Sequence, residues 1–190
     1  MSITITGGKY QGRRIASPKG DAVRPTTGMM RESLFSMLQS RGLILAACFL
    51  DLFSGTGIMG LEALSRGASH ITVVEKNRQQ VNQIEKNYQA ILGEDATDKV
   101  LVTIHNNDVL KFLSRKNPDA PFDVVFMDPP YGFENFSDVL NSLAENNWVS
   151  EERSCIIIEY GSTEPAIDAD NFQRKMYGDS SLSIRWPVSV

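Results

Sequence analysis

From residue 48 onward, short apolar runs alternate with longer segments in which apolar residues recur every three or four positions. The runs predict buried strands, and the periodic segments predict amphipathic helices. Strands are expected at residues 48–53, 70–75, 100–106, 122–128 and 155–160, followed by two more between residues 172 and 188. Helices are expected at residues 58–67, 77–92, 108–116 and 136–148.

This order of elements predicts the fold class. Strands with helices between them form parallel sheets, and strands that are apolar throughout, rather than at alternate positions, are covered on both faces. The last two strands have no helix between them, so we expect one of them to run antiparallel at an edge. The prediction is an α/β, Rossmann-like fold with a mostly parallel sheet of seven strands.

The first 41 residues depart from this rhythm. Residues 3–18, ITITGGKYQGRRIASP, alternate and contain glycine breaks, which is typical of a β-hairpin. Residues 24–38, RPTTGMMRESLFSML, predict a helix that starts near Thr26 or Thr27. We therefore expect residues 1–41 to form a small extension and residues 42–190 to form one compact domain.

Composition places the chain among globular proteins of one domain, with 190 residues and 42% hydrophobic content. No apolar run approaches the roughly 20 residues of a membrane span, and the N-terminus lacks a signal-peptide core, so a cytoplasmic protein is expected. Cys48 and Cys155 lie in apolar runs without a CxxC motif, which indicates buried, reduced thiols. His70 and His105 stand alone, so no metal site is expected.

Charge is distributed unevenly along the chain. Residues 1–41 contain seven basic and two acidic residues, a net charge of +5, whereas the rest carries −9 and the whole chain −4. A basic extension on an acidic body suggests contact with a polyanion. Ordinary solvated surface charge explains the asymmetry equally well, so charge alone leaves both interpretations open.

A glycine loop, DLFSGTGIMG, follows the first strand of the domain. Gly55, Gly57 and Gly60 stand in G-x-G-x-x-G register, and Glu75 ends the next strand twenty residues beyond Gly55. Such a loop lets a ligand lie against bare backbone, and the acid can accept hydrogen bonds from ribose hydroxyls. The pattern predicts a nucleoside cofactor, either NAD or S-adenosylmethionine. The alternative is a glycine turn required only for packing.

Asp108 ends the third strand of the domain. In this topology it lies beside the expected position of the cofactor's adenine, and it could accept a hydrogen bond from the adenine amine. It could equally act as the N-cap of the following helix, and the two roles are compatible.

The segment FDVVFMDPPYGF, residues 122–133, ends a buried strand on Asp128 and continues with two prolines and a tyrosine. Prolines carry no backbone N–H, so the corner offers acceptors in a rigid frame. An acid oxygen and a backbone carbonyl held in place by the prolines could accept hydrogen bonds from both N–H groups of a nucleobase amine and localise its nitrogen lone pair. Tyr131 could stack on the base. An ordinary strand-ending turn is the alternative.

Five motifs together resemble the bacterial 16S ribosomal RNA guanine-N2 methyltransferases of the RsmD type. They stand in the family's order along nearly the whole chain: GGKYQGRR and RPTT with RESLF in the extension, DLFSGTGIMGLEALSRGA at the glycine loop, VEK at residues 74–76, DPPY at 128–131 and KMYGD at 175–179. The resemblance implies a class I methyltransferase that uses S-adenosylmethionine, with Asp128, Pro129 and Tyr131 at the target guanine. It implies these cofactor contacts: Asp51, Phe53, Ser54, Gly55, Thr56, Gly57, Glu75, Lys76, Asp108 and Val109.

The same resemblance implies that the basic extension binds small-subunit rRNA or an assembling 30S particle, and we expect a monomer. The implied RNA contacts are Lys9, Arg13, Arg14, Arg24, Thr26, Thr27 and Arg31. One departure concerns this extension, since Gly28-Met29-Met30 stands where relatives usually have Asp-Arg-Val. If those missing charges help to recognise RNA, the affinity for the RNA substrate or the choice of target nucleotide differs in this protein.

Three other functions use parts of the same pattern. A DNA amino-methyltransferase uses similar corners, but 190 residues leave no room for a separate target-recognition domain. An NAD-dependent oxidoreductase shares the glycine loop, but a substrate domain and a catalytic His or Tyr-Lys arrangement are missing from the sequence. A non-catalytic RNA-binding assembly factor could keep the fold, and the intact residues of the DPPY corner argue against it.

Overall fold

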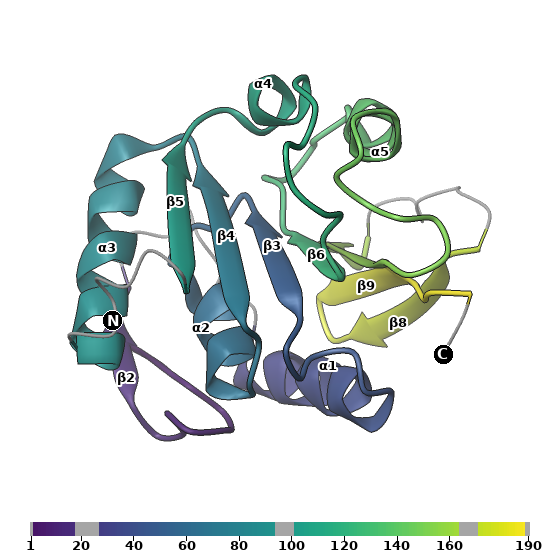
Figure 1. Ribbon diagram of the computed structural model, residues 1–190. Helices are drawn as coiled ribbons and strands as arrows, with labels where there is room; N and C mark the ends of the chain where they lie inside the picture. The colour runs from purple at the N-terminus through teal and green to yellow at the C-terminus, as the bar shows by residue number, and fades with distance from the viewer. Residues whose placement is uncertain (1, 18–26, 94–100, 164–170, 189–190) are drawn as a thin grey trace.

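The computed structural model describes residues 2–17, 27–93, 101–163 and 171–188. Within these residues lies a seven-stranded sheet with the order β5-β4-β3-β6-β7-β9-β8 (Figure 1). Its strands are β3 (Cys48–Leu52), β4 (His70–Glu75), β5 (Val102–Asn106), β6 (Val124–Met127), β7 (Cys155–Gly161), β8 (Gln173–Tyr177) and β9 (Ser180–Arg185). The predicted fold class is confirmed. The reversed strand is β9, which pairs antiparallel with both β7 and the edge strand β8.

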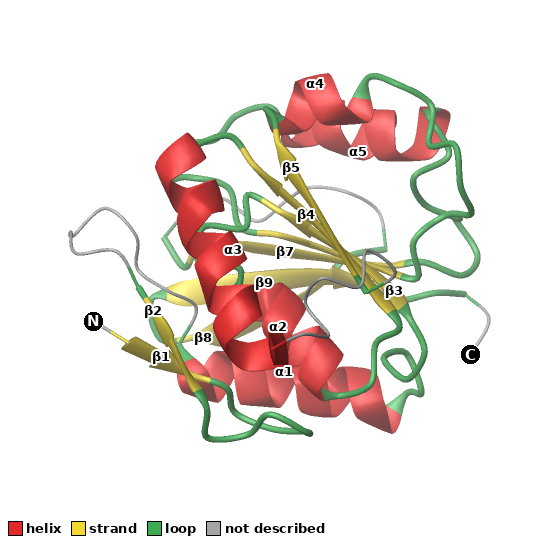
Figure 2. Cartoon of the chain, turned by 60° about the vertical axis from the view of Figure 1, so that its left-hand side comes forward, coloured by secondary structure: helices red, strands yellow, loops and turns green. Residues whose placement is uncertain are grey.

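Helices cover both faces of the sheet. They are α1 (Gly28–Ser40), α2 (Ile58–Ser65), α3 (Arg78–Leu92), α4 (Val109–Leu113) and α5 (Phe136–Glu145). Figure 2 shows α1, α2 and α3 on one side and α4 and α5 on the other. Phe35, Leu61 and Ile84 belong to the apolar cluster of the first face, and Phe112 and Leu143 to that of the second. Burial on both faces explains why the strands β3, β4, β6 and β7 are apolar along most of their length.

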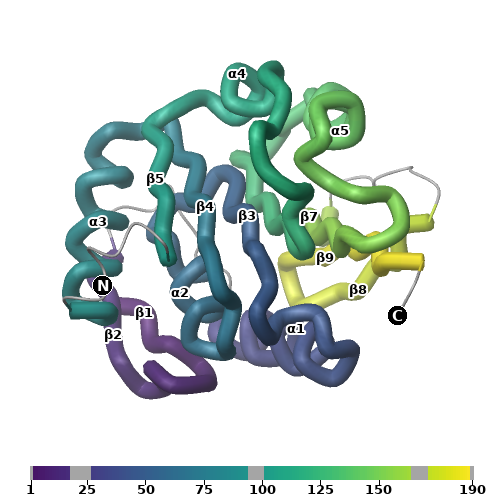
Figure 3. The backbone as a smooth tube through the Cα atoms, in the orientation of Figure 1, coloured from purple at the N-terminus to yellow at the C-terminus, as the bar shows by residue number. Residues whose placement is uncertain are grey.

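The strand order reverses beside β3, and this reversal creates the crevice for a site. The chain builds β3, β4 and β5 outward in one direction, then crosses to place β6 and β7 on the other side of β3 (Figure 3). Leu52 pairs with Met127, so β3 and β6 end at the same level. Ligands of open parallel sheets bind beyond the carboxyl ends at such a reversal.

The N-terminal extension begins with a hairpin of β1 (Ser2–Thr4) and β2 (Arg14–Ala16). Ile3, Ile5 and Ile15 of this segment belong to the same apolar cluster as α2 and α3, so the extension packs directly on the sheet domain. The hairpin lies at the lower left of Figure 1, beside α2 and α3.

Thr27 accepts a hydrogen bond from the Met30 backbone N–H at 3.3 Å and so caps α1. Thr27 is thus the start of the predicted helix, and Thr26 lies outside the described residues. In the Gly28-Met29-Met30 segment, Met30 is buried in the core, whereas Met29 is 79% exposed.

Candidate active site

A cavity of about 520 Å³ opens where β3, β4, β6 and β7 end. This volume lies within the range of small-molecule sites. The lining includes every predicted cofactor residue except Gly57: Asp51, Phe53, Ser54, Gly55, Thr56, Glu75, Lys76, Asp108 and Val109. The structure also brings the three corner residues, Asp128, Pro129 and Tyr131, to the same cavity. Two motifs that are more than 70 residues apart in the sequence therefore border one space.

The three positions of the loop are glycine for different structural reasons. Gly57 has φ of 74°, and a Cβ there would stand 2.8 Å from the Tyr88 ring, whose hydroxyl donates to the Gly57 carbonyl at 3.0 Å. A Cβ at Gly60 would overlap the Tyr88 hydroxyl and Ile71. Gly55, with φ of 55°, faces the cavity. The packing interpretation therefore holds for Gly57 and Gly60, while Gly55 borders the cavity.

Asp51 is the most deeply buried acid of the cavity, at 1% exposed. Its Oδ2 accepts from the Gly60 N–H at 3.3 Å, and its buried Oδ1 has no hydrogen-bond partner within the described residues. Burial raises the pKa of Asp51 to about 7, and the charge of Glu75 adds to the rise, whereas hydrogen bonds from Gly60 and Ser54 oppose it. A buried carboxylate with an unsatisfied oxygen is costly and suits a cationic ligand.

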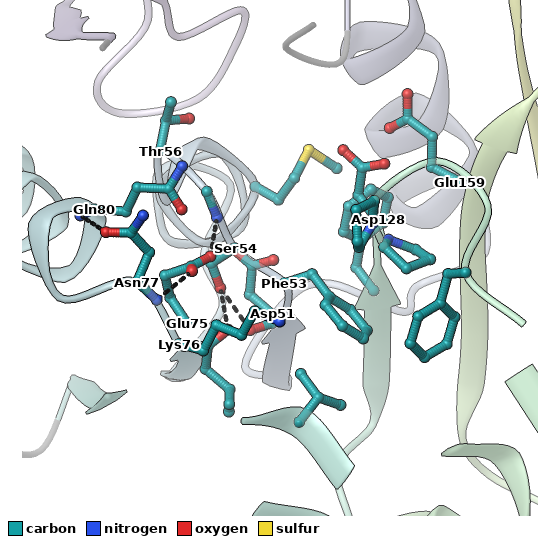
Figure 4. Close-up of a pocket in the computed structure, with 18 of the residues that line it drawn as sticks. Asp51, Phe53, Ser54, Thr56, Glu75, Lys76, Asn77, Gln80, Asp128 and Glu159 are labelled. Atoms are coloured by element: carbon teal, nitrogen blue, oxygen red, sulfur yellow. Dashed lines mark hydrogen bonds between the residues drawn. The ribbon is translucent and has the colours of Figure 1, made fainter. Parts of the chain in front are cut away.

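Glu75 ties the end of β4 to the glycine loop. Its Oε2 accepts from the Gly55 N–H at 3.0 Å, and its Oε1 accepts from the Asn77 N–H at 2.8 Å (Figure 4). Asn106, at the end of β5, donates to the Glu75 carbonyl at 3.0 Å and supports the turn. The carboxylate is thus held in position at the cavity wall, with lone pairs remaining beyond these two bonds.

Asp108 has the N-cap role that was one of its two expected functions. Its side chain accepts from the Lys111 backbone N–H at 3.3 Å at the start of α4. Asp108 also lines the cavity, so its position is compatible with a second role at a ligand.

The DPPY corner continues directly from β6. The Asp128 N–H lies 3.5 Å from the Leu52 carbonyl of β3, and the Phe133 N–H donates to the Pro130 carbonyl at 3.1 Å. Pro129 is buried, whereas Tyr131 is 71% exposed at the cavity mouth. Burial, and after it the charges of Glu159 and Asp51, hold the pKa of Asp128 well above its ordinary value.

An aromatic wall connects the corner to the glycine loop. Phe133 packs edge to face against Phe53, with ring centroids 5.2 Å apart, and contacts Phe136 at the same centroid distance. Phe53 has φ of 57°, a strained value for a residue with a Cβ. Phe53 and Phe133 both line the cavity, so their ring contact lies between the glycine loop and the corner.

Glu159 is a cavity residue that the sequence reasoning missed. It lies near the end of β7, is 5% exposed and lines the cavity beside Asp128 (Figure 4). A usable signal was present, because the run CIIIEY places an acid near the end of a buried strand, as occurs at Asp51, Glu75 and Asp128.

Arg13, which was expected to contact RNA, forms hydrogen bonds with the end of α3. Its guanidinium donates to the carbonyls of Ala90 and Ile91 at 2.6 and 2.7 Å. Because the cavity is lined by Asn77 and Gln80 at the start of α3, these carbonyls lie about 15 to 20 Å from the cavity along the helix. Lys9 and Arg14 are exposed on the same hairpin. Arg24 lies outside the described residues.

The structure corrects the expectation for Arg31. This side chain is 3% exposed, and its Nε donates to Glu62 Oε1 at 3.1 Å, while a second nitrogen donates to the Thr4 carbonyl at 2.8 Å. Glu62 also pairs with Arg66 and accepts from the Thr6 N–H at 2.9 Å. Arg31 therefore belongs to a buried network that joins the extension to α2, and it cannot reach RNA phosphates from this position.

Cys155 is buried and Cys48 is half-buried, and both are free. Burial raises the pKa of Cys155 to about 12, so this thiol remains protonated at neutral pH. The described residues contain no cluster of side chains that could hold a metal ion. They also contain no helix with the length and apolar character that a membrane span requires.

A seven-stranded sheet of this order, with a glycine loop and strand-end acids around one cavity, defines the Rossmann-like methyltransferase class. Comparison with known proteins gives the particular family. The model of the family described as conserved hypothetical protein 95 matches residues 3–186.

Individual relatives agree with this match. Ribosomal RNA small subunit methyltransferase D from Escherichia coli K12 is 35% identical over 150 residues, which cover 79% of this chain and 71% of that protein. A solved structure of the E. coli protein YhhF, named there provisionally as a methyltransferase, has a TM-score of 0.79 at 30% identity, covering 98% of this chain and 99% of that one. This chain belongs to the conserved hypothetical protein 95 family, the RsmD family of methyltransferases.

A more distant structure shares the fold. The Thermus thermophilus 16S rRNA N2 G1207 methyltransferase RsmC, solved with S-adenosylmethionine and guanosine, has a TM-score of 0.69 at 19% identity. The match covers 98% of this chain and 50% of that one.

Proposed function

We propose that this protein transfers a methyl group from S-adenosylmethionine to the exocyclic N2 amine of a guanine in small-subunit rRNA. The observation that carries the proposal is that the Asp128-Pro129-Pro130-Tyr131 corner and the glycine loop border the same cavity. The names of the E. coli and T. thermophilus relatives support the substrate class.

The cavity residues fit S-adenosylmethionine. The unsatisfied Oδ1 of Asp51 is a buried acceptor that suits the ammonium of the cofactor's amino-acid end. Glu75 is positioned to accept from ribose hydroxyls, and Asp108 to accept from the adenine amine. When bound, this cofactor supplies an electrophilic methyl group on a positively charged sulfur.

The corner prepares the acceptor nitrogen. Asp128 and the Pro129 carbonyl accept from the two N–H groups of the amine, which localises the lone pair that the ring otherwise delocalises. The methylated nitrogen then sheds a proton, and the raised pKa makes ionised Asp128 a suitable acceptor for it. Tyr131, exposed at the mouth, stacks on the target base, a contact worth about 1 to 3 kcal/mol.

The N-terminal extension holds the RNA through Lys9 and Arg14. The support is the net charge of +5 over residues 1–41 and the exposure of these two side chains. Since the hairpin contacts the end of α3 about 15 to 20 Å from the cavity, it meets phosphates several nucleotides away from the target base. A folded rRNA or an assembling 30S particle provides such a surface, whereas a short oligonucleotide does not.

Labelled S-adenosylmethionine tests the reaction directly. The protein is incubated with small-subunit particles, naked 16S rRNA or duplex DNA from a strain that lacks the enzyme, and the modified base is mapped. We expect label on the N2 amine of one guanine in small-subunit rRNA. Label on DNA, or no label on any of the three, would overturn the proposal.

Asp128→Asn tests the corner separately. Because the amide keeps the volume of the side chain but loses its charge, we expect methyl transfer to fall at least about 100-fold. Cofactor affinity should stay within a few-fold of the wild-type value. Retained turnover in this variant would contradict the role of Asp128.

A further inference from the structure

Glu159 belongs to a set of four acids that face one side of the sheet. Phe49, Val73, Phe126 and Ile157 all belong to the apolar cluster beneath α1, α2 and α3. Side chains alternate between the faces of a strand, so the residues two positions further along point to that same face. Those residues are Asp51, Glu75, Asp128 and Glu159.

Within this set, Glu159 and Asp128 are neighbours. Met127 of β6 pairs in parallel with Ile158 of β7, so the next residue of each strand stands at the same level. Neighbouring strands lie about 4.8 Å apart, which lets two carboxylates reach adjacent atoms of one ligand. The two acids line the same cavity, and Figure 4 shows them together on the side away from Glu75.

The proposed roles of the other three acids divide the cavity into a cofactor end and a base end, and Glu159 lies at the base end beside Asp128. Asp51 and Glu75 stand at the glycine loop, where the cofactor binds, and Asp128 with Pro129 receives the target amine. In guanine, the atom beside the N2 amine is N1, which carries a hydrogen and is a donor. In adenine, N1 is an acceptor, so a carboxylate in front of it meets a lone pair and is repelled.

We propose that Glu159 accepts a hydrogen bond from the N1–H of the target guanine and thereby selects guanine over bases whose N1 is an acceptor. This inference rests on the proposed function and assigns the base-selecting part of it to one residue. Glu159 is a specificity-determining residue, whereas the amine itself is held by Asp128 and Pro129.

The test uses an analogue that differs from guanine in this feature. 2,6-Diaminopurine keeps the N2 amine but has an acceptor at N1 and an amine in place of O6. Small-subunit rRNA is assembled by ligation so that the mapped target position carries either guanine or 2,6-diaminopurine. The kcat/KM of N2 methylation is then measured on both RNAs at saturating S-adenosylmethionine.

We expect the wild-type protein to prefer guanine by about 10- to 100-fold. In Glu159→Gln, the side-chain amide can donate to an acceptor at N1 as well as accept, so this preference should narrow at least about 10-fold. The matched control is Glu134→Gln, which changes an exposed acid after the corner and should keep the wild-type ratio. A ratio of two substrates cancels any loss of folded protein.

Two results would overturn the inference while leaving the proposed function intact. One is equal methylation of guanine and 2,6-diaminopurine by the wild-type protein, which needs no variant and so does not depend on folding of Glu159→Gln. The other is a variant that loses activity equally on both RNAs, as a purely structural acid would. If the wild-type protein fails to methylate guanine N2 at all, the proposed function falls, and this inference falls with it.

Discussion

Replacing Asp51 by asparagine should stabilise the protein without cofactor and weaken cofactor binding at the same time. The substitution keeps the shape of the side chain and removes a buried charge whose Oδ1 has no partner within the described residues. A gain in stability would be unusual, because most substitutions of buried residues destabilise the folded protein.

The magnitude follows from the pKa of Asp51, which burial raises from 3.8 to about 7. That difference corresponds to about 4 kcal/mol of lost stability when the group is fully ionised. The folded state binds the proton more tightly than the unfolded state, so stability falls as pH rises between about 4 and 7. An asparagine amide leaves its own buried N–H groups unsatisfied at about 1 to 3 kcal/mol. We expect Asp51→Asn to be about 1 to 3 kcal/mol more stable than wild type at pH 8.

The pH dependence separates this cause from general repacking. The stability gap between variant and wild type should shrink by about 2 to 3 kcal/mol from pH 8 to pH 5, because wild-type Asp51 takes up its proton over that range. Urea denaturation at the two pH values, without cofactor, measures the gap. Other titrating groups are common to both proteins, and Glu85→Gln on the exposed surface of α3 serves as the control.

Cofactor binding should change in the opposite sense. S-adenosylhomocysteine carries the same ammonium as the cofactor and is not turned over, so calorimetry with it reports binding alone. We expect Asp51→Asn to lower its affinity about 10- to 100-fold, the usual worth of a hydrogen bond to a charged group. A variant that is less stable than wild type at pH 8, or a gap that does not change with pH, would refute the reasoning about the unsatisfied oxygen.

Three further predictions concern the rest of the molecule. Glu62→Gln removes the buried charge that Arg31 and Arg66 share, so urea denaturation should show a loss of stability of about 3 to 5 kcal/mol, and an unchanged midpoint would contradict this network. Gly60→Ala should destabilise by about 1 to 3 kcal/mol, and adding Tyr88→Phe, which removes the overlapping hydroxyl, should recover at least about 1 kcal/mol relative to the sum of the single changes. Neutralising Lys9 and Arg14 should lower the slope of log affinity for 16S rRNA against log salt by about 1 to 2 without altering cofactor affinity, and an unaltered slope would count against the hairpin as an RNA surface.

The fold was predictable because each strand carries its own local signal. A strand buried on both faces must be apolar throughout, and a run such as CIIIEY shows this in six residues. The capping threonine of α1 and the glycine loop were also visible, since caps and turns depend on one or two side chains. The order of strands in the sheet then follows from the handed, short connections that parallel sheets permit.

The roles of the arginines were not predictable, because they depend on partners far away in the sequence. Arg31 pairs with Glu62 on another helix, and Arg13 meets the last carbonyls of α3, 77 and 78 residues further along the chain. Composition counts both charges as available for a polyanion, whereas the fold has buried Arg31 and has engaged the guanidinium of Arg13, which stays exposed, with two carbonyls. A basic segment therefore predicts an anion-binding surface only to the extent that its charges stay exposed, as Lys9 and Arg14 do here.

The four strand-end acids show where sequence reasoning could have gone further. Asp51, Glu75 and Asp128 each precede glycine, turn or proline motifs that draw attention, whereas Glu159 is followed by no such motif. Face alternation alone relates all four, since each lies two residues beyond a core residue of the same sheet face. Four acids on one face are costly in an empty fold, and burial accordingly raises the pKa of Asp51 and of Asp128. The raised pKa values of these two acids are explained if ligands bring positive charge and hydrogen-bond donors to this end of the sheet, as the cofactor's ammonium and the N–H edge of a guanine would.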